Sequence, residues 1–267
     1  MPVRLNKEQA MSSRILAGIA LFSLLPYAAC GQSAARVEPS EEMASLDEAA
    51  ADEEVNSEVT GSTASPIQAQ TETWSFDDIT VGAIPERWRI EQTNPRGEGA
   101  QWSVVQETSA PSGEQALALK DPRGARGSAY NLAWTDAASF QNGRIEVKVK
   151  AGTGREDQGG GPIWRVQDKD NYYIARWNPL EDNFRLYSVR SGDRRQLASA
   201  NVNVPAATWQ TIAIEHQGDR ITGFLNGRKM FEVEDNTFAE AGGIGVWTKA
   251  DAATSFDDLT IAAGVAQ

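Results

Sequence analysis

Short runs of alternating apolar and polar residues, divided by turn residues, dominate the chain from Trp74 onward. The clearest run is Arg144 to Lys150, RIEVKVK, in which apolar and charged side chains alternate without interruption. A period of two residues is typical of a β-strand with one buried face and one solvated face. Asn-Gly pairs begin at Asn142 and Asn226, and such pairs favour tight turns because both residues accept positive φ. The sequence therefore predicts an all-β domain.

More than ten short strands are expected, and no segment keeps a helical period. Beyond the run above, the predicted strands are 74–80, 102–107, 116–120, 129–135, 162–168, 172–178, 184–190, 208–215, 221–225, 229–233, 243–248 and 255–262. Strands of this number and length imply a sandwich of two sheets. The motif Ser-Phe-Asp-Asp occurs at Ser75 and again at Ser255, which predicts that the first and last strands lie side by side and bury Phe76 and Phe256.

The aspartates of this repeated motif are a candidate metal site. Asp77, Asp257 and Asp258 carry carboxylates, which hard cations such as calcium prefer as ligands. They lack the ligand spacing of a dedicated calcium loop, so turn and strand-end carboxylates in water are the favoured interpretation. We therefore expect no required cofactor, with a structural calcium ion as the alternative.

The N-terminus has the pattern of an export signal. Arg14 precedes the apolar run Ile15 to Leu25, which is too short to span a bilayer of about 30 Å but is typical of a signal peptide. The segment Tyr27 to Gly31 resembles a bacterial lipoprotein cleavage box, although Tyr27 stands where leucine is usual. Cys30, the only cysteine, is then the expected lipidation site. The alternative is cleavage at a later small-residue site, such as after Ala35.

Residues 31–73 are expected to form a disordered acidic linker between the signal peptide, 1–30, and the sandwich domain, 74–267. This segment contains ten acidic residues and one basic residue, Arg36, so it accounts for most of the formal net charge of −12. It has too few apolar side chains to offset its chain entropy. The domain that follows has no basic stripe, which argues against a nucleic-acid partner. These features predict a monomeric, exported cell-envelope lipoprotein at the outer membrane or periplasmic face, held to the membrane by its lipid anchor only.

The segment Asp168 to Tyr187 concentrates polar groups among aromatic rings, as sites for polar ligands with an apolar ring face do. If Trp164 and Val166 point into the core, strand alternation also points Tyr173 and Trp177 inward. The opposite face then collects the candidate ligand-binding residues Arg165, Gln167, Tyr172, Arg176, Asn178, Arg185, Tyr187, Trp247 and Lys249. The alternative interpretation is an ordinary charged outer face with incidental aromatic residues.

Few residues are available for catalysis. His216 is the only histidine, which disfavours a nucleophilic triad and a zinc site. Glycoside hydrolysis needs two carboxyl groups about 5 to 9.5 Å apart. Glu181 at the end of the predicted hairpin, paired with Asp168 or with Asp182, is the candidate acid and base. The run Gly159 to Gly161 is interpreted as a permissive turn, because neither a helix nor Lys-Ser/Thr follows it.

The order GGPIWRVQDKDNYYIARWNPLEDNFRLY, then Trp209 and NGRKMFEVED, then GGIGVWTKADAATSFDDLTI, resembles the concanavalin A-like or laminin G-like jelly roll. It is most similar to secreted bacterial domains of the 3-keto-disaccharide hydrolase domain family. The likeness covers Trp74 to Ala263 and is specific from about Gly159 onward. Trp177 and Pro179 depart from the family pattern, in which small residues follow the arginine. The resemblance implies a jelly-roll sandwich with a carbohydrate-related role on its concave sheet.

Three functions remain open on this reasoning. The favoured prediction is a carbohydrate-binding module that uses the concave face. The first alternative is a glycoside hydrolase or lyase that acts on an oxidised or acidic sugar with Glu181 or Asp168 as acid or base. The second alternative is a cell-surface adhesion module that binds protein.

Overall fold

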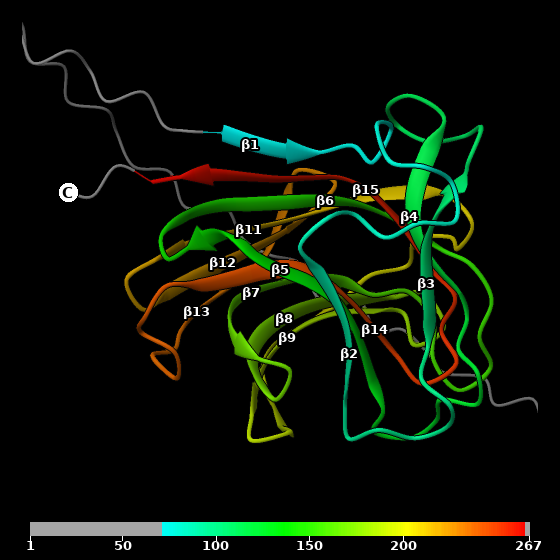
Figure 1. The fold of residues 1–267 in the computed structure, drawn as a ribbon. Helices are drawn as coiled ribbons and strands as arrows, with labels where there is room; N and C mark the ends of the chain where they lie inside the picture. Colours follow the sequence, from blue (N-terminus) through cyan, green and yellow to red (C-terminus); the bar gives the residue numbers. More distant parts are fainter. Residues whose placement is uncertain (1–70, 265–267) are drawn as a thin grey trace, which may run out of the picture. The chain divides into compact units, whose positions relative to one another are not determined.

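The computed structural model of the chain describes residues 71–264, which form fifteen strands in two antiparallel sheets (Figure 1). The eight-stranded sheet has the order β13-β12-β11-β6-β15-β4-β3, with β1 added beside β15. Its strands are β1 (Thr71–Trp74), β3 (Gln101–Gln106), β4 (Gln115–Asp121), β6 (Gly143–Ala151), β11 (Trp209–Gln217), β12 (Arg220–Leu225), β13 (Arg228–Glu234) and β15 (Thr254–Ala263). The all-β jelly-roll prediction is confirmed.

The seven-stranded sheet lies below the other sheet in Figure 1 and has the order β10-β9-β8-β7-β14-β5-β2. Its strands are β2 (Trp88–Thr93), β5 (Tyr130–Phe140), β7 (Gly161–Asp168), β8 (Asn171–Asn178), β9 (Asn183–Arg190), β10 (Asp193–Asn201) and β14 (Gly242–Lys249). Residues 71–264 contain no helix that is long and apolar enough to cross a membrane.

The first and last strands of the described region lie side by side, as predicted. β1 pairs with β15 from Thr71 opposite Ala262 to Trp74 opposite Leu259. The strand begins three residues earlier than expected, and the chain after Trp74 turns instead of continuing as a strand to residue 80. Phe76 and Phe256 are both buried in the core between the sheets. At the other end of the sheet, Asn226 and Gly227 adopt φ of 51° and 77° and connect β12 to β13, which confirms the predicted tight turn.

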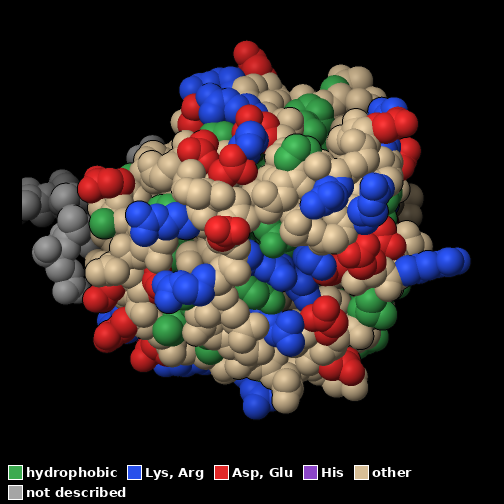
Figure 2. Space-filling model, turned by 90° about the horizontal axis from the view of Figure 1, so that it is seen from below, with side chains coloured by type: hydrophobic (Ala, Val, Ile, Leu, Met, Phe, Trp, Pro, Cys, Tyr) green, Lys and Arg blue, Asp and Glu red, His purple; other side chains and the backbone are tan. Residues whose placement is uncertain are grey.

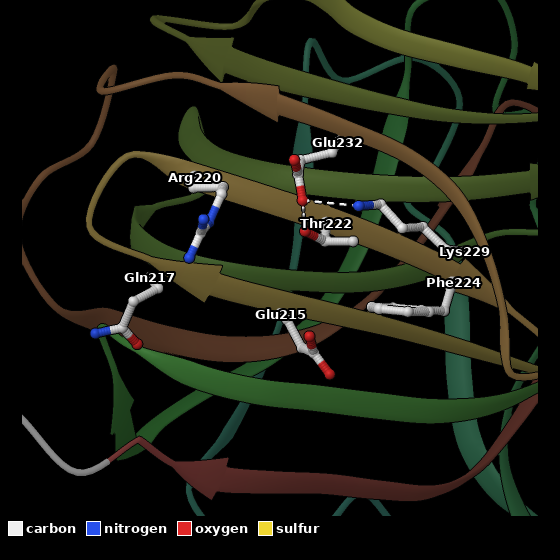
Figure 3. Close-up of a pocket in the computed structure, with 7 residues that line it drawn as sticks. All are labelled: Glu215, Gln217, Arg220, Thr222, Phe224, Lys229 and Glu232. Atoms are coloured by element: carbon white, nitrogen blue, oxygen red, sulfur yellow. Dashed lines mark hydrogen bonds and ion pairs between the residues drawn. The ribbon is translucent and has the colours of Figure 1, made fainter. Parts of the chain in front are cut away.

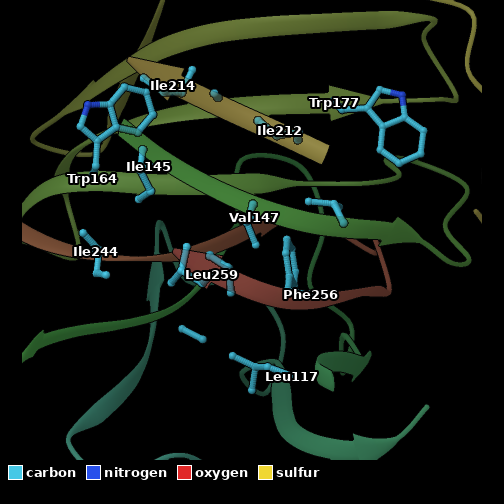
Figure 4. Close-up of a cluster of buried hydrophobic side chains, with 14 of the residues drawn as sticks. Leu117, Ile145, Val147, Trp164, Trp177, Ile212, Ile214, Ile244, Phe256 and Leu259 are labelled. Atoms are coloured by element: carbon cyan, nitrogen blue, oxygen red, sulfur yellow. The ribbon is translucent and has the colours of Figure 1, made fainter. Parts of the chain in front are cut away.

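The main core lies between the two sheets (Figure 4). Trp164, Tyr173 and Trp177 reach into it from the seven-stranded sheet, so the inward orientation predicted for these residues is confirmed. Ile145, Val147, Ile212 and Ile214 meet them from the eight-stranded sheet. Each fully buried apolar side chain of this size contributes about 1.5 to 3 kcal/mol relative to exposure, so this layer is a major source of stability.

A second buried cluster covers the opposite face of the seven-stranded sheet, here called the concave face. It comprises Tyr130, Leu132, Trp134, Ile163, Val166, Tyr172, Ile174, Tyr187, Val189 and Trp247. The sheet curls so far that the Tyr172 hydroxyl on β8 meets the Thr93 hydroxyl on β2 at 2.9 Å, although three strands separate β8 from β2. Trp247 Nε1 also donates to the Tyr172 hydroxyl, at 3.1 Å. The middle of the concave face is therefore filled by its own aromatic side chains.

Candidate functional site

Beside this aromatic cluster, the concave face carries a connected set of charged groups, here called the Arg176 network: Asp157, Arg176, Glu181, Arg185 and Lys249. Arg176 on β8 donates to Asp157 Oδ2 at 3.1 Å and to Glu181 Oε2 at 2.8 Å. Lys249 on β14 donates to the same Asp157 oxygen at 2.9 Å. Arg185 on β9 donates to Glu181 Oε2 at 3.0 Å. Three cations and two carboxylates thus form one continuous set of ion pairs.

Two asparagines hold the carboxylates of the network in place. Asn178 Nδ2 donates to Asp157 Oδ1 at 3.2 Å, and the Asn178 side-chain oxygen accepts the backbone N–H of Leu180 at 2.9 Å. Asn183 Nδ2 donates to Glu181 Oε2 at 3.0 Å. Because Asn178 and Asn183 are cross-strand partners at the end of the β8–β9 hairpin, the turn itself positions Glu181.

Asp157 comes from the loop between β6 and β7 rather than from a strand. The Asp251 carboxylate accepts the backbone N–H groups of Arg155 at 2.8 Å and of Asp157 at 3.0 Å, which fixes the loop. Gly160 then crosses so close to the backbone oxygen of Trp247 that a Cβ at this position would overlap it. The glycine run predicted to be a permissive turn therefore lets the loop approach the sheet closely enough to bring Asp157 against Arg176. This geometric role was missed from the sequence, as was Asp157 itself.

The pKa values of the two carboxyl groups, Asp157 and Glu181, are shifted in opposite directions. Burial raises the pKa of the Asp157 carboxyl, against the opposing charges of Arg176 and Lys249. Burial is weaker at Glu181, where the hydrogen bond from Asn183 and the charges of Arg176 and Arg185 hold the pKa of that carboxyl below its usual range. Glu181 is therefore ionised at neutral pH and held by three donors.

The network is buried at one end and open at the other. The side chains of Asp157 and Arg176 are 0% and 1% exposed, whereas those of Glu181, Arg185 and Lys249 are 41%, 32% and 17% exposed. Figure 2 views the molecule from the side of the seven-stranded sheet and shows Lys and Arg side chains next to Asp, Glu and hydrophobic side chains near the centre of the view. Only the open end can reach a ligand, and it offers a carboxylate, a guanidinium and an ammonium group.

Three predicted aromatic contacts lie on the concave face but are covered. Tyr172 and Trp247 are 0% exposed and bond each other, and Tyr187 is 4% exposed. Burial raises the pKa of the Tyr172 hydroxyl far above its usual range. These rings form the floor beneath the site and are not a free stacking surface.

The prediction that Arg165 and Gln167 share this face is wrong. A β-bulge at Arg165, with φ of 47°, interrupts the alternation of β7, so that Val166 takes the concave side. The buried Arg165 guanidinium donates instead to the backbone oxygens of Gln141 at 2.7 Å and Phe238 at 2.6 Å. Gln167 donates to the backbone oxygens of Arg165 and Ala241 at the edge of the sheet. Both residues support loops.

The structure also separates the predicted catalytic pair. Asp168 precedes β8 and Glu181 follows it, so the length of this eight-residue strand, about 25 Å, lies between them. The Asp168 carboxylate accepts the backbone N–H of Asp170 at 2.7 Å and the Asn171 amide at 2.9 Å, which stabilises the β7–β8 turn. Two carboxyl groups at opposite ends of a strand cannot flank one glycosidic bond.

The aspartates of the repeated motif accept hydrogen bonds from the protein. Asp77 Oδ1 accepts the backbone N–H of Glu114 at 3.0 Å, and Asp257 Oδ2 accepts that of Ser112 at 3.2 Å. Asp258 Oδ1 accepts the Ser112 hydroxyl at 2.7 Å. Within residues 71–264, no group of three His, Cys, Asp or Glu is arranged to hold a metal ion. The calcium alternative therefore stays a prediction, and Cys30 lies outside the described residues.

The outer face of the eight-stranded sheet carries a separate hollow of about 210 Å³ (Figure 3). It is lined by Glu215, Gln217, Arg220, Thr222, Phe224, Lys229 and Glu232. The Glu232 carboxylate accepts hydrogen bonds from the Lys229 ammonium group at 2.8 Å and from the Thr222 hydroxyl at 3.1 Å. Such contacts are common on a solvated strand surface. This hollow faces away from the Arg176 network and offers control positions for mutagenesis.

Comparison with known proteins supports a carbohydrate-related domain. The sequence profile of the 3-keto-alpha-glucoside-1,2-lyase-like domain matches residues 75–262. The levanase of Bacillus subtilis (strain 168) is 25% identical over 162 residues, which are 60% of this chain and 22% of the levanase. The chain therefore spans about a fifth of the length of that curated relative.

Solved structures share the fold at low sequence identity. The carbohydrate-binding module CBM66 from Bacillus subtilis matches with a TM-score of 0.50 and 17% identity, covering 66% of this chain and 96% of the module. The exoplasmic/lumenal domain of VIP36, in its Ca2+/Man-bound form, matches with a TM-score of 0.50 and 11% identity, covering 74% of this chain and 91% of that domain. At such identities, the likeness concerns the jelly-roll fold.

Proposed function

Because the chain belongs to the 3-keto-alpha-glucoside-1,2-lyase-like domain family, we propose that it is a carbohydrate-binding module whose ligand contacts the open end of the Arg176 network. The observation that carries this proposal is the arrangement of Glu181, Arg185 and Lys249. Their exposed ends belong to side chains that ion pairs have already ordered, at 3.0 Å between Arg185 and Glu181 and 2.9 Å between Lys249 and Asp157. Ordered polar groups bind hydroxyls with less loss of side-chain entropy than free ones.

The chemistry of these groups suits a polyol. The ionised Glu181 carboxylate accepts hydrogen bonds from sugar hydroxyls, while Arg185 and Lys249 donate to hydroxyl or carboxylate oxygens. The buried pair of Asp157 and Arg176 fixes the positions of both Glu181 and Lys249 from beneath. The covered aromatic floor makes the side of the site that faces the protein apolar, which strengthens hydrogen bonds formed against it.

Glycan binding by the full chain tests this proposal. Wild-type protein and the Arg185→Ala variant are applied to an array of plant and bacterial oligosaccharides, with Lys229→Ala on the opposite sheet as the matched control. We expect a defined set of retained glycans that Arg185→Ala loses and Lys229→Ala keeps. Equal loss with both variants, or retention of all hits by Arg185→Ala, contradicts the assignment to the concave face.

A lyase is the second candidate function, and the opposite pKa shifts of Asp157 and Glu181 favour it. A 1,2-elimination next to a 3-ketone needs a base to remove the proton at C2 and an acid to protonate the oxygen that leaves C1. Glu181 is accessible as a base, but its lowered pKa makes it a weak one, and Asp157 is fully buried. Binding is therefore the preferred function. Incubation with 3-keto-α-glucosides and analysis of the products by NMR separates the two, since binding alone releases no product.

We also propose that the domain is exported and anchored by lipid at Cys30. The support is the order of Arg14, the apolar run that follows it, and a cysteine next to small residues. Metabolic labelling with a fatty-acid analogue in a bacterial host is the test. Incorporation of the label into the wild-type chain but not into Cys30→Ser supports lipidation. If neither protein incorporates the label, the anchor proposal is wrong.

A further inference from the structure

Within residues 71–264, one arginine on the concave face has no ionic partner. Arg194, on the edge strand β10, extends over the aromatic floor of the face. Its Cζ atom lies 4.3 Å from the ring centre of Tyr187, 5.2 Å from that of Tyr130 and 6.0 Å from that of Trp247. These are cation–π distances, and rings on several sides fix the guanidinium in place.

The hydrogen-bond donors of this guanidinium are free. Among the described residues, no carboxylate lies within ion-pair distance of Arg194, and its buried Nη1 has no hydrogen-bond partner. By contrast, its neighbour Arg195, whose side chain points away, is paired with Asp235. A buried N–H without a partner is unfavourable, because it has lost its bond to water and gained none from the protein. Because Nη1 is covered by protein atoms, a ligand has to bond this guanidinium through Nε and Nη2, which find no acceptor among the described residues.

Arg194 stands directly beside the open end of the Arg176 network. Tyr187 is two residues from Arg185 on the same face of β9, and Tyr130 is the cross-strand partner of Lys249. Two residues along a strand span roughly 7 Å, so one small oligosaccharide can contact both Arg194 and the open end of the Arg176 network.

Around the open end of the Arg176 network, cations outnumber carboxylates, although Glu91 also lies on the concave face, where it accepts the Trp134 indole N–H at 2.7 Å. The network holds Arg176, Arg185 and Lys249 against Asp157 and Glu181, and Arg194 adds a fourth cation with no carboxylate of its own. This local excess of positive charge, four cations against two carboxylates around Arg185, Lys249 and Arg194, favours an anionic ligand over a neutral one.

We propose that the site takes an acidic oligosaccharide, and that Arg194 binds the carboxylate of a uronic acid unit. This inference rests on the proposed carbohydrate-binding function and adds the class of sugar. The guanidinium is a planar fork that matches the two oxygens of a carboxylate, and the rings that hold it reduce the entropy lost on binding. Glu181, Arg185 and Lys249 then bond the hydroxyls of the same or the adjoining sugar.

Matched sugars and matched variants test this proposal in the full chain. The probes are galacturonate and mannuronate trisaccharides, their methyl esters, and the neutral galactose and mannose trisaccharides, measured by isothermal titration calorimetry. The variants are Arg194→Gln, Arg194→Lys and, as the control on the other side of β10, Arg195→Gln. Circular dichroism melts identify any variant that has lost its fold.

We expect wild-type protein to bind an acidic trisaccharide at least 10-fold more tightly than its methyl ester, since a charge-assisted hydrogen bond is worth about 1.5 to 3 kcal/mol. Arg194→Gln removes this preference, Arg194→Lys restores part of it, and Arg195→Gln leaves it unchanged. The preference also weakens as salt is added.

Two results overturn the proposal separately from the proposed function. The first is equal affinity for acidic, esterified and neutral trisaccharides. The second is a preference for the acid that survives in Arg194→Gln. Either result rejects the role of Arg194 and keeps the carbohydrate-binding function. If the arginine variants change nothing because no trisaccharide and no array glycan binds, the proposed function itself fails. Sulfated galactose trisaccharides serve as a further probe, and tighter binding of these than of galacturonate trisaccharides contradicts the assignment of a carboxylate.

Discussion

The buried guanidinium of Arg176 lies 3.1 Å from the buried carboxylate of Asp157 and thereby joins the middle of a sheet to a loop that precedes it in the chain by 19 residues. Neither charge reaches solvent, so both are compensated inside the protein, by each other and by Glu181 and Lys249. The exposed Glu181 and Lys249 take their positions from this pair. The pair is therefore both a structural element and the support of the proposed site.

Breaking this pair should destabilise the protein strongly. Asp157→Leu leaves the buried Arg176 with only the half-exposed Glu181 as counter-charge and leaves Lys249 unpaired, so a loss of about 3 kcal/mol in the free energy of unfolding is expected. The double variant Asp157→Leu/Arg176→Met removes both charges and should lose less than either single variant. Urea denaturation measures these differences.

The exposed pair of Arg89 and Asp136 is the control for that experiment. Its side chains are 48% and 49% exposed, so Asp136→Ala should change the free energy of unfolding by less than about 1 kcal/mol. A loss at Asp157→Leu no larger than this value would show that the buried pair is not needed.

His216 should stay neutral down to strongly acidic pH. The imidazole is 0% exposed, its Nδ1 accepts the Trp164 indole N–H at 2.9 Å, and burial lowers its pKa to about 3. The unfolded chain has a histidine pKa of about 6.5 and so binds more protons than the folded chain between about pH 3 and 6.5. His216 therefore makes the free energy of unfolding decrease as the pH falls through this range.

Proton NMR can follow this group directly, since the chain has a single histidine. The imidazole resonances of the folded protein should not shift between pH 8 and the onset of acid unfolding. A titration with a midpoint near 6.5 in the folded protein would place the ring in solvent and contradict its buried position.

Gly160→Ala should disturb the site as well as the fold. A Cβ there overlaps the Trp247 backbone oxygen and pushes away the loop that carries Asp157. The matched control is Gly227→Ala in the β12–β13 turn, where a Cβ meets no atom within 4 Å and only the positive φ of 77° is unfavourable. We expect about 1 kcal/mol of destabilisation for the control and clearly more for Gly160→Ala. Thermal melts compare the two, and equal effects would rule out the close approach.

The period of two residues was sufficient to predict the fold and half of the site. It correctly placed Tyr173 and Trp177 inward and Arg176 and Arg185 on the opposite face. It failed at Arg165, because a bulge adds a residue to the strand and reverses every later side chain. Nothing in the local sequence marks that bulge.

Other features of the site depend on tertiary geometry. Asp157 lies in a loop that no strand pattern covers, and its contact with Arg176 depends on glycines that permit close approach. Arg194 lies on an edge strand whose charged sequence, Asp193 to Gln196, hides the β pattern. The curl of the sheet, which buries Tyr172 and Trp247, is a property of seven strands together and cannot be predicted from one of them.

The affinity of the full chain for a retained oligosaccharide, measured by calorimetry with wild-type protein and Glu181→Gln, tests the central claim most directly. Glu181→Gln keeps the side-chain shape but removes the charge that accepts hydroxyls and orders Arg185. The proposed site predicts that the dissociation constant rises at least 10-fold, because a hydrogen bond to a charged group is worth about 1.5 to 3 kcal/mol. An unchanged dissociation constant in a folded Glu181→Gln protein would place glycan binding elsewhere on the molecule.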